Sequence, residues 1–256
     1  MWTRMTLRAL GLAVAALALE VGCSHAAAAQ YQPNISMARL SQVPPGELGD
    51  VHAQQAQLDG ARATAHRAWM AYRQADRAVK VAKADENLAK SQLEQQKQIS
   101  KMSTQPIQPG AEQRAAREQA APETYPPVSK LYGAQLKLDA AKAKVKYLQK
   151  YRDYAKARAD VAGRLVGYNQ AKLDEAVFDT LERVRPQEAA GMKHRAPWFA
   201  SKVASRQADL ENARADMDQE HAQEMQKFDA WRAANDKLPP ADQLAPPPDP
   251  GTLPAL

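Results

Sequence analysis

Cysteine and aromatic residues are scarce in this chain, and each shortage excludes a class of structure. A single cysteine, Cys23, excludes an internal disulfide and a thiolate metal cluster. Three Phe and four Trp cannot fill a thick globular core, and much of the 45% hydrophobic content is alanine. Abundant alanine combined with 25% charged residues is typical of long helices.

Sequence marks of catalysis are missing as well. The chain contains no G-x-S-x-G, no H-E-x-x-H and no glycine-rich phosphate loop. The histidines are scattered without the four-residue spacing that places two ligands on one helix face. They are His25, His52, His66, His194 and His221. We therefore expect no catalytic residue, no metal and no cofactor, and we do not expect an enzyme.

Residues 1–22 are expected to form a bacterial signal peptide. Arg4 and Arg8 precede an apolar run over residues 9–19. That run is too short to cross a bilayer, which takes about 20 residues.

Two cleavage sites compete after this run. Val-Gly before Cys23 is similar to the end of a lipobox, which would make Cys23 the acylated mature N-terminus, although Glu20 stands where that motif usually has leucine. The alanines of residues 26–29 instead offer an A-x-A site, which predicts a mature protein that begins near Gln30 and is soluble in the periplasm. The absence of any other cysteine favours lipidation of Cys23.

Two heptad repeats predict long helices over residues 47–102 and 128–185. With Leu58 at position a of the first repeat, five consecutive d positions are alanine. With Leu131 at position a of the second, five of seven d positions are alanine. Such a seam must be buried against another helix, and each helix would be about 80 Å long. The proline-rich linker of residues 104–127 is too short to run back along that length, so the pair must be an antiparallel hairpin.

Charged and polar residues within these seams should fix the register of the hairpin. Arg152 falls at an a position and Asn169 at a d position of the second repeat. Glu86 falls at an a position of the first repeat, and we interpret it as a register device or a partner for Arg152.

A third helix is expected over residues 197–237, with Pro197 at its first position. It carries many acidic side chains that suit the basic flank of the hairpin, and these are Asp209, Glu211, Asp216, Asp218, Glu220, Glu224, Asp229 and Asp236. We therefore predict an all-α fold, a long antiparallel coiled-coil hairpin with a third helix folded back as an elongated three-helix bundle. Pairing of hairpins between chains in a homo-oligomer remains an alternative.

Residues 23–46 should form a polar tether. Residues 238–256 contain seven prolines and should form an extended or disordered tail.

A basic cluster on the second helix is a candidate surface for a polyanion or a protein partner. Its members are Lys137, Lys142, Lys144, Lys146, Lys150, Lys156 and Arg158. Nucleic acid is not the expected ligand, because the signal predicts export and no groove-reading motif is present. An anionic envelope surface or an acidic envelope protein fits the charge better, and the third helix should pair with part of the cluster.

With its signal over residues 4–23, its polar tether and its alanine-rich heptads, the chain resembles the helical envelope lipoproteins of Gram-negative bacteria. The resemblance implies a fatty acyl anchor, such as palmitate, at Cys23 and a place at the periplasmic face of the outer membrane. We expect a scaffold lipoprotein, a helical spacer or recruitment rod. The alternative is a periplasmic holdase chaperone that uses a basic helical hairpin. The hairpin of an efflux adaptor is disfavoured, because the flanking β domains are absent from the sequence.

Overall fold

The computed structural model describes residues 37–104, 126–249 and 253, which belong to one compact unit of the chain. Within these residues the structure contains helices and no strand. The helices are α1 (Gly49–Thr104), α3 (Pro126–Val184), α4 (Pro186–Ala190) and α5 (Ala196–Asn235). Short 3-10 turns form at Met37–Gln42, Pro45–Glu47 and Pro240–Asp242. The ends of the three long helices lie within two residues of their expected positions.

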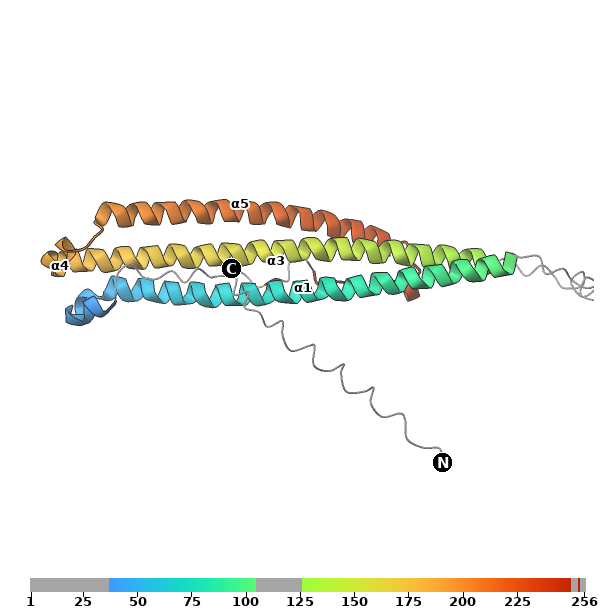
Figure 1. Ribbon diagram of the computed structural model, residues 1–256, viewed down its shortest axis with the longest axis horizontal. Helices are drawn as coiled ribbons and strands as arrows, with labels where there is room; N and C mark the ends of the chain where they lie inside the picture. Colours follow the sequence, from blue (N-terminus) through green and yellow to red (C-terminus); the bar gives the residue numbers. More distant parts are fainter. Residues whose placement is uncertain (1–36, 105–125, 250–252, 254–256) are drawn as a thin grey trace, which may run out of the picture. The chain divides into compact units, whose positions relative to one another are not determined.

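Helix α3 is the central element of this unit. It packs against α1 on one side and α5 on the other, and Figure 1 shows it running between them. Helices α1 and α5 make few contacts with each other. The predicted all-α fold, a long hairpin with a third helix folded back, is thereby confirmed.

The hairpin is antiparallel, as the length of its linker required. Near the linker, Ala89 and Leu93 of α1 share an apolar cluster with Leu138 and Ala141 of α3. At the other end, α1 and α3 meet through Leu58 and Leu173, which share a cluster. Residue numbers therefore rise along one helix as they fall along the other.

The alanine seam of α1 is buried along its length. All five predicted d positions, which are Ala61, Ala68, Ala75, Ala82 and Ala89, are at most 9% exposed. A methyl side chain contributes only about 0.8 kcal/mol per buried carbon, so a seam of this kind needs many turns to hold two helices together. The length of the hairpin follows from its small side chains.

The predicted pairing of Glu86 with Arg152 is wrong. Glu86 Oε1 pairs with Lys90 Nζ at 2.9 Å, and Arg152 Nη2 pairs with Asp153 Oδ1 at 2.8 Å. The register explains the difference. Ala89 packs beside Ala141, and this places Glu86 about two helical turns of α3 away from Arg152.

The predicted tether is too long at its C-terminal end. Leu40 and Val43 are 6% and 5% exposed, and they pack with Phe178 and Phe199 where α3 ends and α5 begins. Two apolar side chains in a short turn thus close this end of the bundle. Residues 23–36 of the tether and residues 105–125 of the predicted linker lie outside the described residues.

Candidate interaction site

The segment that follows α5 is held against α3 by three polar contacts. Lys137 Nζ pairs with Asp242 Oδ1 at 2.7 Å, Lys144 Nζ donates to the carbonyl oxygen of Ala245 at 3.0 Å, and Tyr147 Oη donates to that of Pro248 at 2.6 Å. The contacts follow the same order in both segments, so residues 242–248 run parallel to α3. A disordered tail therefore does not describe residues 238–249, and the extended alternative fits them.

Apolar side chains seat the same segment over the α1–α3 seam. Leu244 packs on the cluster that contains Leu93 and Leu138, and Leu253 packs on the cluster that contains Tyr151. The turn out of α5 is closed by Asn235, whose Oδ1 accepts a hydrogen bond from Leu244 N at 2.9 Å. Regular periodicity plays no part in this packing, which is why the sequence did not reveal it.

A buried carboxyl lies behind this seat. Glu224 of α5 is 0% exposed. Its Oε2 is 3.0 Å from His221 Nδ1, and its Oε1 is 3.4 Å from Tyr147 Oη. The phenol has a single hydrogen, and its shorter contact is to the carbonyl of Pro248, which can only accept. At 3.4 Å the contact between Tyr147 Oη and Glu224 Oε1 is longer than an ordinary hydroxyl hydrogen bond, so Tyr147 donates mainly to Pro248.

Burial disfavours the charged form of Glu224. Burial raises the pKa of Glu224 above its ordinary value, although the hydrogen bond from His221 opposes the shift. Burial also raises the pKa of Tyr147, and the nearby Glu224 adds to that effect. Polar contacts thus connect His221, Glu224, Tyr147 and Pro248, and they link α5, α3 and the tail.

Aromatic rings surround this chain of hydrogen bonds. Tyr147 meets Phe228 with ring centroids 5.2 Å apart, and Phe228 meets Trp231 at 5.6 Å. Tyr154 stacks on His221 at 4.6 Å and lies under the guanidinium of Arg158 at 5.7 Å. The rings exclude water from Glu224 and fix the orientation of His221.

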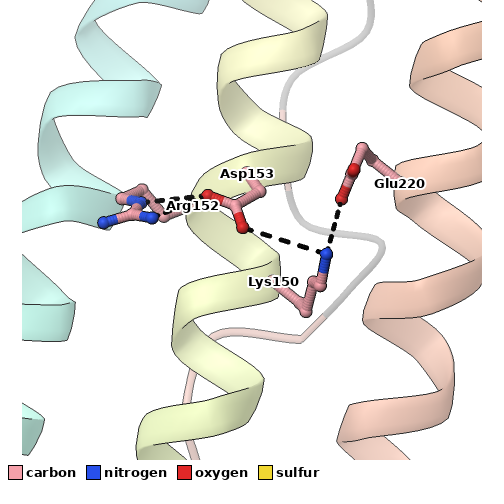
Figure 2. Close-up of polar contacts among 4 residues, drawn as sticks. All are labelled: Lys150, Arg152, Asp153 and Glu220. Carbon is pink, nitrogen blue, oxygen red and sulfur yellow. Dashed lines mark hydrogen bonds and ion pairs between the residues drawn. The ribbon is translucent and has the colours of Figure 1, made fainter.

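The predicted basic cluster is divided between internal and exposed positions. Lys137 and Lys144 hold the tail, and Lys150 Nζ pairs with Glu220 Oε2 of α5 at 3.2 Å. Figure 2 shows Lys150 between Asp153 and Glu220, while Arg152 extends toward α1. The expected pairing of the third helix with this cluster is found at Lys150.

The remaining members of the cluster do not act together. Arg158 covers Tyr154, and Lys142 is half-buried. Lys146 and Lys156 are exposed, and neither forms an ion pair with a described residue. The exposed carboxylates of Asp139 and Asp160 lie on either side of the two exposed lysines in the sequence of α3. A surface for a polyanion or a protein partner stays a prediction for these residues.

Sequence reasoning missed the residues that seat the tail. Tyr147 is not part of any heptad seam in the sequence, and Glu224 is one acid among the many of the third helix. The one local signal was the spacing of His221 and Glu224, which places both side chains on the same helix face.

Comparison with protein-family models, curated proteins and solved structures finds no match for this chain. Along the described residues, no helix has an apolar stretch long enough to cross a membrane. The same part of the chain brings together no cluster of three or more His, Cys, Asp or Glu suited to a metal ion. Cys23 lies outside the described residues, so its lipidation stays a prediction.

Proposed function

We propose that this chain is a lipid-anchored scaffold of the bacterial cell envelope, a helical spacer held at the periplasmic face of the outer membrane by acylated Cys23. An envelope protein would be its partner. Its helices would serve as a rod that separates or recruits other components. The anchor is argued from the sequence around residues 4–23, and the rod from the arrangement of the helices.

One observation carries the proposal most. Leu40 and Val43 connect the N-terminal segment to the end of the bundle where α1 begins. Helix α1 then runs for 56 residues, about 84 Å, before the chain turns into α3. The described residues nearest to Cys23 in sequence and the last residues of α1 are thus at opposite ends of that helix, which suits a spacer.

The anchor is tested by intact-mass measurement of the mature protein from a membrane fraction. We expect a chain that begins at Cys23 and carries a diacylglyceryl and an acyl group. A Cys23→Ala variant should lose the lipid mass and move to the soluble fraction. A wild-type mature chain that begins near Gln30 and is soluble would contradict the anchored scaffold.

A holdase chaperone is the second candidate, and exposed apolar side chains near the hairpin turn favour it. Ile99, Met102 and Tyr132 are 49%, 65% and 65% exposed, on a part of the hairpin that α5 does not reach. Surfaces of this kind bind unfolded chains or partners. Suppression of aggregation of a denatured outer-membrane protein at substoichiometric amounts would support the chaperone, whereas co-purification with one fixed envelope partner would support the scaffold.

A further inference from the structure

We propose that the groove holding residues 242–249 and Leu253 is an exchangeable binding site for an extended proline-rich peptide from a partner protein. The chain's own tail is then the competing occupant. We refer to this site as the tail groove, and it is formed by Lys137, Lys144, Tyr147 and Tyr151 of α3 together with the facing side of α1. The inference does not depend on the lipid anchor.

The contacts of the tail groove recognise a general peptide pattern. Lys144 and Tyr147 bind backbone carbonyl groups, which every peptide offers. Ten residues of α3 between Lys137 and Tyr147 cover about 15 Å, and six residues of a polyproline II strand cover about 19 Å, so an extended strand matches the spacing of the contacts. Proline residues already favour this extended conformation before binding, so a proline-rich peptide loses less conformational entropy when it binds. The pattern is an acid, a leucine two residues later, and then a run of prolines.

The bound tail leaves part of the groove unfilled. An open cavity of about 450 Å³ lies beside Pro248 and Leu253, and it is lined on the α1 side by His66, Arg67 and Met70. Met70 is 43% exposed. A longer or bulkier peptide has room to make contacts here that the tail does not make.

One further feature favours exchange. The side chains of Lys137 and Asp242 are 37% and 42% exposed, so water and salt weaken their attraction.

The test uses the full chain with its tail released. Asp242→Lys reverses the ion pair with Lys137, and Leu244→Ser removes the apolar contact. A fluorescent peptide with the wild-type sequence of residues 238–256 is then titrated into this double variant and into the wild type. We expect saturable binding to the double variant, at least tenfold tighter than to the wild type, in which the tail competes.

Matched lysine variants identify the bound site. In the tail-released background, Lys144→Ala should weaken peptide binding severalfold, whereas Lys146→Ala should leave it unchanged, because Lys146 is exposed and makes no tail contact. Equal losses from both variants would show general attraction to basic charge and would overturn the proposal. Absence of binding by a released variant that keeps wild-type helix content would also overturn it.

A second measurement covers the case in which the released variant does not fold. Hydrogen–deuterium exchange of the wild-type chain is recorded with and without a saturating excess of the unlabelled peptide. Displacement should speed exchange in residues 241–245 and leave exchange in α5 unchanged. Identical exchange of the tail at every peptide concentration would mean that the tail is a permanent part of the bundle.

Discussion

At the scale of single residues, Glu224 of α5 contacts Tyr147 of α3, which also binds the tail. The carboxyl is fully buried. It contacts His221 on its own helix and Tyr147 on α3. The positive charge of Arg158 on α3 lowers its pKa, as His221 does. A carboxyl in such a place is stable when neutral and hydrogen-bonded, and it is costly when ionised without full compensation. The stability of this junction should therefore depend on pH.

The sign of that dependence follows from the raised pKa of Glu224. Below about pH 4.5 the carboxyl is protonated in both the folded and the unfolded chain, so the folded state keeps its full stability. As the pH rises from about 4.5 toward the higher pKa of the folded state, the unfolded chain loses the proton before the folded chain does. The folded state therefore loses stability relative to the unfolded state over this pH range, and the loss is complete above the pKa of the folded state. A single group changes the free energy of unfolding by at most about 1.4 kcal/mol per pH unit.

We expect Glu224→Gln to remove this pH dependence, because the amide keeps hydrogen-bonding groups but does not titrate. Urea unfolding of both proteins, followed by circular dichroism from pH 4 to pH 8, should show the wild type losing stability relative to the variant as the pH rises. Glu211→Gln, at an exposed position on the same helix, should leave the profile unchanged. Parallel profiles for the wild type and Glu224→Gln would refute a raised pKa of Glu224 in the folded chain.

At the scale of the elements, the α1–α3 seam depends on side chains that are small. Ala82 is 2% exposed in the cluster that includes Val145 and Leu148, whereas Ala84, two residues later on the same helix, faces solvent. Added volume at the seam must push the two helices apart or force strained rotamers. The same added volume at the exposed position meets only water.

We therefore expect Ala82→Leu to lower the free energy of unfolding by about 1–3 kcal/mol. Ala84→Leu should change it by no more than about 0.5 kcal/mol, as is usual for exposed positions. Denaturant titration of both variants measures the difference. A neutral effect of Ala82→Leu would show that the helices do not approach as closely as the alanine seam requires.

Periodic patterns explain what the sequence could predict. The alanines at d positions repeat every seven residues, so they revealed the seam and the two long helices, and the short linker between the helices showed that the hairpin is antiparallel. The tail could not be found in this way, because Asp242, Leu244 and Pro248 bind through spacing along an extended strand and through backbone carbonyls. Glu86 and Arg152 were paired wrongly because heptad positions give a helix face and not the longitudinal register. The buried state of Glu224 depends on three segments far apart in sequence, which no local pattern records.

At the scale of the whole molecule, the hairpin of α1 and α3 should tolerate the removal of one heptad from each helix, because the two helices then stay in the same register. Residues 94–100 of α1 lie opposite residues 130–136 of α3, as judged from Leu93 and Leu138 in one cluster. Both segments lie beyond the end of α5, and they come before Lys137, the first residue that binds the tail. Removing one heptad from each arm leaves the seam pattern, α5 and the tail contacts in place.

We expect this matched deletion to shorten the hairpin by about 10 Å while the chain still folds, because seven residues of helix rise about 1.5 Å each. Small-angle X-ray scattering should record a smaller maximum dimension, and thermal unfolding should remain cooperative. Removing residues 94–100 alone leaves Leu131 and Leu136 of α3 without their facing arm, so this variant should melt at a lower temperature and bind more of a hydrophobic dye. Equal melting of the single and matched deletions would mean that the two arms are not paired in this register. In that case the proposed role as a spacer would lose its structural basis.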